Sequence, residues 1–266
     1  MAKHPTMVER LTSRFRRDAA SSPGRIDGAI ASGALTAVYQ PIVDLRTGST
    51  FAFESLARSA APELPNPYVL FNTAVEERAT GRLGRELRAL AVNNAPDRPL
   101  FLNIHPHEFD EGFLVRTDDA MFYHEHEVFL EVTESVPLSH FEQCHGVLQE
   151  IRNKGMRLAI DDLGAGYSNL VYIAELVPDV VKLDMGLIRE LQDSHRKQRV
   201  ITAMVRMCEE LGASVVGEGI ETLDELRAVI DCGVHYGQGY LLARPAKPAP
   251  DVHWPLGHDP AAAVGE

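Results

Sequence analysis

The sequence contains little cysteine, and its cysteines are far apart. Cys144, Cys208 and Cys232 are the only three among 266 residues. An odd number without C-x-x-C spacing fits neither a disulfide framework nor a cysteine-rich zinc site. We therefore expect a reducing compartment and predict a cytoplasmic protein.

Long apolar runs are also missing, as are the motifs of several enzyme classes. No uninterrupted apolar stretch approaches the roughly 20 residues that cross a bilayer. The first residues, MAKHPTMVER, include no apolar core of a signal peptide, so we predict no membrane insertion. The chain has no P-loop and no G-x-S-x-G nucleophile motif, which argues against a P-loop nucleotide site and a Ser-His-Asp hydrolase.

Basic residues are in the minority. The 26 lysines and arginines face 38 aspartates and glutamates, and the formal net charge is −12. Nonspecific attraction to DNA or RNA comes from basic side chains that replace the counterions of the phosphates. We therefore predict no nucleic-acid polymer as a partner, and an anionic ligand would need local positive charge.

The remaining composition is that of one folded α/β domain. Hydrophobic residues make up 45% and charged residues 24% of the chain, which is ordinary for a globular protein. We predict an N-terminal extension over 1–22, one domain over 23–248, and a Pro- and Ala-rich tail over 249–266 that lies on the surface. The extension has a helical pattern over 7–20, which fits a solvated helix, a remnant of a linker, or a dimer or membrane-surface contact.

Hydrophobic runs typical of β-strands recur along the chain, and each ends in an acidic, amide or lysine side chain. Those end residues are Glu54, Asn103, Glu131, Asp161 with Asp162, Lys182 with Asp184, and Glu218. Helical patterns cover 68–93, 139–153, 169–175, 194–211 and 223–232. The alternation of strands and helices predicts a barrel of parallel strands. Residues 38–55 differ, because two strand patterns flank a turn at 46–48 and predict a β-hairpin.

A parallel barrel would bring these strand ends to one rim. Five or more acidic and amide side chains would then share one pocket, and carboxylates at short range raise one another's pKa unless positive charge is present. Divalent cations with oxygen ligands provide such charge. The sequence therefore predicts a metal enzyme.

Eight segments between Tyr39 and Pro245 carry a resemblance to a known family. They are YQPIVDL, ESLAR, LNIHP, LEVTES, DDLGAGYSNL, VKLD, GEGIET and GQGYLLARP. In this order and spacing they resemble the EAL family of cyclic di-GMP phosphodiesterases. The resemblance implies a modified TIM (β/α)8 barrel with an antiparallel first strand. It also implies hydrolysis of cyclic di-GMP, a bacterial second messenger, to linear 5′-pGpG, with Mg²⁺ or Mn²⁺ as cofactor and two ions per site.

The resemblance also implies the metal and catalytic residues. One ion would be held by Glu54, Asn103, Glu131 and Asp161, and a second by Asp161 and Asp162. Such hard oxygen donors favour Mg²⁺ or Mn²⁺ over zinc. Glu218 would be the general base or a further ligand near the attacking water. Lys182 would position that water or offset charge on the phosphate.

Substrate binding and dimerisation are implied in the same way. Substrate contacts would come from Arg58 at the phosphate, from Gln40 at a guanine, and from Leu56, Asp184, Glu221 and Gln238 in the pocket. Glu134 would anchor the loop over 164–168, which links the metal site to dimer formation in the family. Cyclic di-GMP and a second copy of the chain are therefore the expected partners.

Some residues depart from the family pattern. Ser55 adds a hydroxyl within the signature triplet, no tryptophan follows Arg58, and His105 stands where a serine is common. The missing tryptophan bears on substrate affinity. The pairs His105 with His107 and His124 with His126 have the spacing of a transition-metal site, but we predict surface histidines. The alternative function is a non-catalytic module that binds cyclic di-GMP or another protein.

Overall fold

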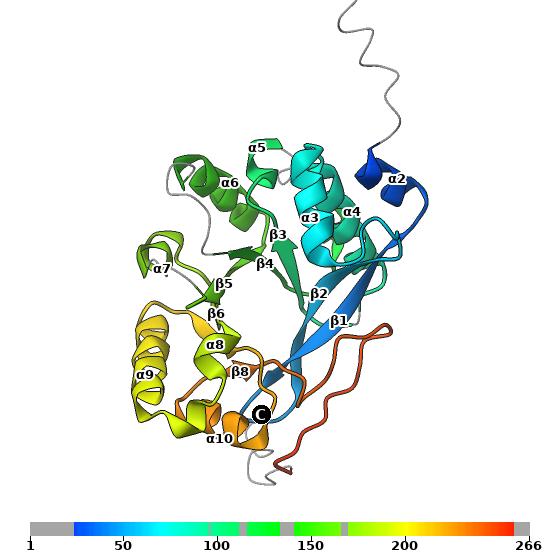
Figure 1. Ribbon diagram of the computed structural model, residues 1–266. Helices are drawn as coiled ribbons and strands as arrows, with labels where there is room; N and C mark the ends of the chain where they lie inside the picture. The colour runs from blue at the N-terminus through cyan, green and yellow to red at the C-terminus, as the bar shows by residue number, and fades with distance from the viewer. Residues whose placement is uncertain (1–23, 96, 112–115, 134–140, 166–169, 258–266) are drawn as a thin grey trace, which may run out of the picture.

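The computed structural model describes residues 24–95, 97–111, 116–133, 141–165 and 170–257 (Figure 1). Several predictions fall outside these ranges. They concern the helix over 7–20, the loop anchor Glu134, residues 166–168 of the predicted loop, and the end of the tail over 258–266.

Within the described ranges, eight strands close a barrel in the order β1 to β8. Their bounds are β1 Leu35–Asp44, β2 Thr50–Ser59, β3 Leu100–Ile104, β4 Val128–Thr133, β5 Arg157–Leu163, β6 Val180–Leu183, β7 Ser214–Gly217 and β8 Tyr236–Gly237. Strand β1 is antiparallel to both neighbours, and every other neighbouring pair is parallel. The predicted modified TIM barrel with an antiparallel first strand is confirmed.

A tight turn between β1 and β2 explains the antiparallel start. The Asp44 carboxylate accepts hydrogen bonds from the backbone N–H groups of Arg46 and Thr47, at 2.8 and 3.0 Å. Gly48 has a φ of 73°, a left-handed conformation that glycine adopts without steric cost. A connection this short can join only antiparallel strands, because parallel strands need a crossover of about a dozen residues.

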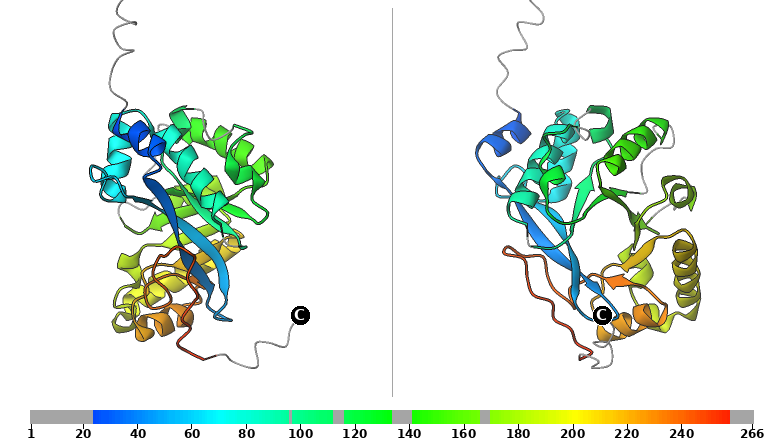
Figure 2. Two further views of the ribbon diagram at one scale, coloured as in Figure 1. Left: turned by 90° about the vertical axis from the view of Figure 1, so that its right-hand side faces the viewer. Right: turned by 180° about the vertical axis from the view of Figure 1, so that it is seen from behind.

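The helices lie around the outside of the barrel (Figures 1 and 2). The α-helices are α2 Arg25–Ala31, α3 Pro67–Glu76, α4 Thr80–Asn93, α5 Glu108–Glu111, α6 Phe141–Asn153, α7 Leu170–Leu176, α8 Met185–Ile188, α9 His195–Glu210 and α10 Leu223–Asp231, and the 3-10 turns are η2 Ala120–Tyr123 and η4 Leu191–Asp193. Helix α9 begins after Ser194, whose hydroxyl accepts from the Lys197 N–H, and α10 begins with a capping box of Thr222 and Glu225. No helix of the described ranges is both long enough and apolar enough to cross a bilayer.

The barrel interior has an apolar layer below a polar one. The apolar layer consists of Ile42, Ala52, Phe101, Phe129, Ala159, Val180 and Val216. Residues two apart in a strand face the same side, so the next inward positions toward the open end belong to Glu54, Asn103, Glu131, Asp161, Lys182 and Glu218. The apolar layer closes the barrel beneath the polar side chains.

The segment that leads into the predicted tail lies on the barrel surface, beside β1 (Figure 1). Ala246 and Tyr39 exchange two backbone hydrogen bonds, at 2.9 and 3.0 Å. Further along, Trp254 packs over the β1–β2 turn so closely that a Cβ on Gly48 would lie 2.6 Å from its ring. This part of the segment is therefore held by specific contacts, and the proposed domain limits stay predictions.

Candidate active site

The polar side chains predicted from the strand ends converge at the open end of the barrel. Lys182 lies at their centre, with its side chain 1% exposed. Its Nζ is 2.5 Å from Glu131 Oε1, 2.7 Å from Glu218 Oε1, 3.1 Å from Asp161 Oδ1 and 3.5 Å from Glu54 Oε2. One ammonium group thus contacts carboxylates from β2, β4 and β5 and from the end of β7.

Amide groups orient the Glu54 carboxylate. Asn103 Nδ2 donates to Glu54 Oε1 at 3.1 Å, and Gln238 Nε2 donates to Glu54 Oε2 at 2.7 Å. Gln238 Nε2 also donates to Gln40 Oε1, and Gln40 Nε2 donates to the Ala243 carbonyl, both at 3.1 Å. The structure therefore places the predicted substrate residues Gln40 and Gln238 in a hydrogen-bonded chain that holds Glu54.

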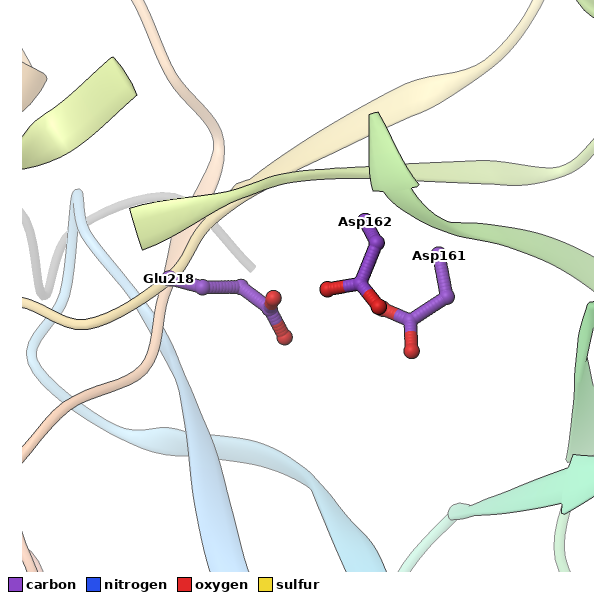
Figure 3. A group of neighbouring side chains, drawn as sticks. All are labelled: Asp161, Asp162 and Glu218. Atoms are coloured by element: carbon purple, nitrogen blue, oxygen red, sulfur yellow. The ribbon is translucent and has the colours of Figure 1, made fainter. Parts of the chain in front are cut away.

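A bulge brings two consecutive aspartates to the same site. In a regular strand, adjacent side chains point to opposite faces. The pairing of β5 with β6 is interrupted between Ile160 and Leu163, and Asp162 has a φ of 58°. As a result, carboxylate oxygens of Asp161, Asp162 and Glu218 all lie within 4.8 Å of one another (Figure 3).

The carboxyl groups of this cluster differ in acidity. Burial, with a contribution from Asp161, raises the pKa of Asp162 to about 6. Burial also raises the pKa of Glu218 to about 8, although Lys182 opposes the rise. The same cause raises the pKa of Glu131 well above its ordinary value. Burial opposes ionisation of Glu54 too, but Lys182 and the two amides outweigh it and lower the pKa of that carboxyl.

Lys182 remains charged among these groups. Burial by itself would lower the pKa of the ammonium group, but the surrounding carboxylates outweigh this and raise it well above its ordinary value. One positive charge faces Glu54, Glu131, Asp161 and Glu218, with Asp162 beside them. The cluster therefore has an excess of negative charge that further cations or protons must balance.

The donor set fits divalent cations. Glu131 Oε2 is buried and has no hydrogen-bond partner among the described residues, and Asp161 Oδ1 has only the ion pair with Lys182. Buried polar atoms normally have a partner. Carboxylate and amide oxygens are the ligands of hard cations such as Mg²⁺ and Mn²⁺. The set predicted from the sequence, Glu54, Asn103, Glu131, Asp161 and Asp162, is therefore gathered in one place and suited to such ions.

Two cavities adjoin the cluster, and both are lined by Glu54 and Leu56. One of about 490 Å³ extends toward α3 and α4 and is lined also by Arg58, Phe71, Asn103 and His105. The other, of about 400 Å³, is lined also by Gln40, Asp162, Asp184, Glu218, Glu221 and Gln238. The predicted substrate residues are thus divided between two chambers that meet at the cluster.

Two of the predicted pocket residues also have structural partners. Asp184 caps α8 by accepting a hydrogen bond from the Gly186 N–H at 2.8 Å. Glu221 lies 3.4 Å from Arg189 Nη2 in an exposed ion pair. Both still line the smaller cavity.

Sequence reasoning missed some lining residues. Phe71 lies on α3, with its ring parallel to that of His105 at 6.0 Å. Met185 and Tyr240 line the smaller cavity and are 42% and 49% exposed. The exposed tyrosine directly after Gln238-Gly239 was a usable signal, whereas nothing in the pattern of α3 distinguishes Phe71 from a core residue.

The two histidine pairs make different kinds of contact. The rings of His105 and His107 stack at 5.4 Å. His124 contacts the Arg98 carbonyl, and His126 contacts the exposed Asp97. The predicted surface role fits these contacts.

The comparison with protein families decides the relationship. Residues 24–245 match the family model described as the EAL domain. The chain belongs to the EAL domain family. The resemblance carried by the eight sequence segments is thereby confirmed.

Relatives of this EAL domain include named enzymes. The cyclic di-GMP phosphodiesterase PA2567 of Pseudomonas aeruginosa is 36% identical over 230 residues, which cover 82% of this chain and 39% of that protein. The cyclic di-GMP phosphodiesterase RocR of the same species is 30% identical, covering 94% of this chain and 70% of RocR. The chain thus spans about two-fifths of the length of PA2567, which has further sequence outside the match.

Solved EAL structures share the fold. BlrP1 of Klebsiella pneumoniae, in a complex with calcium and cyclic di-GMP, has a TM-score of 0.73 and 29% identity, covering 92% of this chain and 67% of that one. An EAL domain protein of Listeria monocytogenes also has a TM-score of 0.73, with 28% identity and coverage of 85% and 94%. The barrel described above is therefore the EAL fold.

Proposed function

We propose that this EAL domain hydrolyses cyclic di-GMP to linear 5′-pGpG with Mg²⁺ or Mn²⁺ as cofactor. The observation that carries the proposal is the cluster of Glu54, Asn103, Glu131, Asp161, Asp162 and Glu218 around Lys182, between two cavities. A non-catalytic descendant would have no reason to keep so many buried ionisable groups, because an unpaired buried charge is costly. Relatives named as cyclic di-GMP phosphodiesterases support the same reaction.

The metal ligands in this proposal are Glu54, Asn103, Glu131, Asp161 and Asp162. When bound, a pair of divalent cations polarises the phosphodiester and favours ionisation of the attacking water. Asn103 and Gln238 hold the Glu54 carboxylate in one orientation through hydrogen bonds to its two oxygens. These two hydrogen bonds fix the orientation of one of the proposed ligands.

The remaining residues act on the water and the substrate. Glu218 takes the proton of the attacking water, its carboxylate held 2.7 Å from Lys182 Nζ. Lys182 offsets negative charge that builds up on the phosphate. The bond between the water oxygen and phosphorus forms as the bond from phosphorus to a 3′ oxygen breaks. That oxygen takes up a proton from solvent, and the ring opens to 5′-pGpG. Arg58, in the larger cavity, binds phosphate oxygens through its planar guanidinium.

Product analysis tests the proposal. Purified protein is incubated with cyclic di-GMP and Mn²⁺ or Mg²⁺, and the nucleotides are separated by chromatography. We expect pGpG with either ion, none in the presence of EDTA, and loss of most turnover in Glu54→Ala and Glu218→Ala. Intact cyclic di-GMP at high enzyme concentration refutes the proposal, and calorimetric binding without product would establish the non-catalytic alternative.

A homodimer and a cytoplasmic location belong to the same proposal. The predicted loop anchor Glu134 lies outside the described residues, so the dimer rests on the family relationship alone. Light scattering at assay concentration tests it, and a monomeric mass contradicts it.

A further inference from the structure

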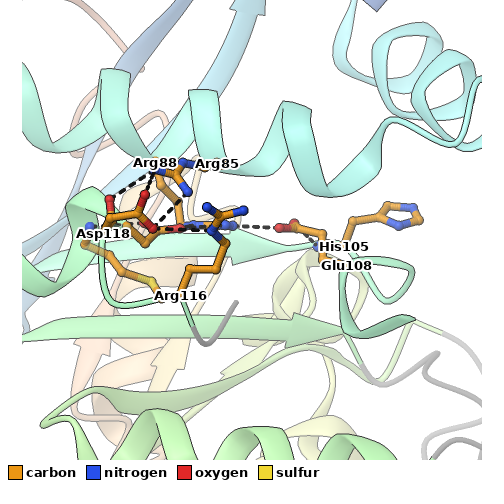
Figure 4. Close-up of polar contacts among 8 residues, drawn as sticks. Arg85, Arg88, His105, Glu108, Arg116 and Asp118 are labelled. Carbon is orange, nitrogen blue, oxygen red and sulfur yellow. Dashed lines mark hydrogen bonds and ion pairs between the residues drawn. The ribbon is translucent and has the colours of Figure 1, made fainter. Parts of the chain in front are cut away.

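A buried ion cluster lies between α4 and the connection from β3 to β4, away from Lys182. Arg88 of α4 is 2% exposed, Glu108 1% and Asp119 0%. Arg88 Nη1 donates to Glu108 Oε2 at 2.7 Å, and Arg88 Nε donates to Asp119 Oδ2 at 3.0 Å. Figure 4 shows Arg88 and Glu108 in this cluster. One guanidinium thus joins two parts of the connection between β3 and β4.

A glycine of helix α4, Gly84, leaves the space that the Glu108 carboxylate occupies. A Cβ on Gly84 would lie 2.2 Å from Glu108 Oε2 and 2.4 Å from its carboxyl carbon. Glycine in a helix interior is unfavourable relative to alanine by roughly 1 kcal/mol. Here it lets the carboxylate lie against the helix backbone, within reach of Arg88 one turn later.

The other oxygen of Glu108 holds the end of β3. Glu108 Oε1 accepts a hydrogen bond from the His105 backbone N–H at 3.0 Å, and the Glu108 N–H donates to the His105 carbonyl at 2.8 Å. His105 directly follows β3, and Asn103 is two residues earlier. Arg88 and His105 both line the larger cavity together with Asn103.

Stability by itself is a weak reason for such a cluster. Replacing a buried ion pair by packed hydrophobic side chains is often neutral or stabilising, because ions lose their hydration on burial. Arg88, Glu108 and Asp119 provide something that hydrophobic packing does not, which is a fixed geometry for the backbone of His105. The hydrogen bonds of a guanidinium and a carboxylate are directional, whereas hydrophobic packing is not.

We propose that Arg88 and Glu108 are positioning residues for the active site. Glu108 packs against Gly84, binds Arg88 and fixes the backbone at His105. This backbone in turn positions the Asn103 amide against Glu54. It also positions the His105 side chain, which lines the larger cavity. The inference rests on the proposed function, since it assigns Asn103 to a metal ion. Both act through the backbone at His105 and are not among the residues assigned to the metal ions or the attacking water.

Two variants disturb the cluster in different ways. Glu108→Gln keeps the size of the side chain, but it replaces one of the two acceptor oxygens by an NH2 group, which then faces a donor, either Arg88 or the His105 N–H. Gly84→Ala keeps every charge and displaces Glu108 sterically. Gly28→Ala is the matched control, because Gly28 is also within a helix, α2, and a Cβ there meets nothing within 4 Å.

The first measurement is the NMR signal of the Asn103 side-chain amide in metal-free ¹⁵N-labelled protein. We expect it to shift or broaden in Glu108→Gln and Gly84→Ala and to stay unchanged in Gly28→Ala. The second measurement is calorimetric titration with Mn²⁺ alone. We expect the affinity to fall about tenfold in both variants, the lower end of the range found when residues that orient metal ligands are changed.

A purely structural role gives a different result. Lower melting temperatures with an unchanged Asn103 signal and wild-type Mn²⁺ affinity would overturn the inference. If Gly84→Ala does not fold, Glu108→Gln alone decides. The Asn103 signal also separates this inference from the proposed function, because it does not depend on turnover. If the wild-type protein leaves cyclic di-GMP intact, the variants can still be compared with it for a shift of this signal.

Discussion

Lys182 Nζ lies 2.5 Å from Glu131 Oε1, with side-chain exposures of 1% and 0%. The contact joins β6 to β4 across the barrel, directly above the apolar layer. The same ammonium group also contacts Glu54, Asp161 and Glu218. Lys182 therefore provides part of the positive charge that offsets these carboxylates, and cations or protons balance the rest.

Removing that charge should affect both stability and turnover. In Lys182→Met, a side chain of similar length leaves buried carboxylates without their cation, and breaking a buried pair in this way costs about 3–5 kcal/mol. We expect a clear fall in the melting temperature of metal-free protein and loss of nearly all hydrolysis of cyclic di-GMP. Differential scanning calorimetry in EDTA and the product assay measure the two effects.

Lys247→Met serves as the control for this variant. Lys247 is exposed, and its Nζ donates a hydrogen bond to the Thr36 hydroxyl at 3.2 Å. The control should keep wild-type stability and turnover. A Lys182→Met protein as stable as the control in EDTA would contradict the role given to this lysine.

Metal binding should strengthen as the pH rises. A cation binds the ionised carboxyl groups, whereas the metal-free site holds protons because the pKa is about 8 for Glu218 and about 6 for Asp162. Protons on Asp162, a proposed ligand, and on the neighbouring Glu218 oppose binding of the ion, so the Mn²⁺ affinity should fall as the pH drops through about 8 and again through about 6. Calorimetry at pH 6, 7 and 8 in two buffers of different ionisation enthalpy measures both the affinity and the proton release.

The same pKa values set the pH dependence of stability without metal. A carboxyl group whose pKa is higher in the folded than in the unfolded state takes up a proton on folding. Glu218 should therefore make the metal-free protein less stable as the pH rises from about 4.5 to about 8. Glu218→Gln should remove the upper step of this dependence, and an identical profile in that variant argues against the assignment.

The bulge at Asp162 can be tested with two substitutions. Its φ of 58° is left-handed, a conformation that costs an ordinary residue about 1–2 kcal/mol but that asparagine tolerates. We expect Asp162→Asn to fold as stably as the wild type, or more stably, and to lose most turnover. Asp162→Ala should lose turnover and also about 1 kcal/mol of stability.

Urea unfolding and the product assay separate the two effects of Asp162. If Asp162→Ala and Asp162→Asn unfold at the same urea concentration, the left-handed backbone at this position does not cost alanine the expected stability. Full turnover in Asp162→Asn would show that this carboxylate is not a ligand in the reaction.

The amide chain to Glu54 predicts unequal effects of two similar substitutions. Gln238 donates directly to Glu54 at 2.7 Å, whereas Gln40 reaches Glu54 only through Gln238. We expect Gln238→Leu to weaken Mn²⁺ binding by about tenfold or more and Gln40→Leu to weaken it less. The double variant should be little worse than Gln238→Leu, because the Gln40 contribution passes through the residue already removed.

Calorimetric titration of the three proteins with Mn²⁺ provides this double-mutant cycle. Additive losses would mean that Gln40 acts independently of Gln238. That result would favour the predicted contact of Gln40 with a guanine over a role in holding Glu54.

The sequence by itself determined the barrel and most of its polar layer. Hydrophobic runs ending in Glu54, Asn103, Glu131, Asp161, Lys182 and Glu218 predicted strands whose ends meet at one rim, because side-chain direction alternates along a strand and parallel strands share an orientation. The hairpin at the start was visible for a similar local reason, since a short turn can join only antiparallel strands.

Only the tertiary structure decided which polar groups touch and what each does. Three features bring together residues from different elements. They are the bulge that turns Asp162 toward Glu218, the hydrogen bonds from Gln40 through Gln238 to Glu54, and the contact of Glu108 with Gly84. Contacts of this kind depend on packing distances between elements that are far apart in the chain, and local propensity and periodicity carry no information about such distances.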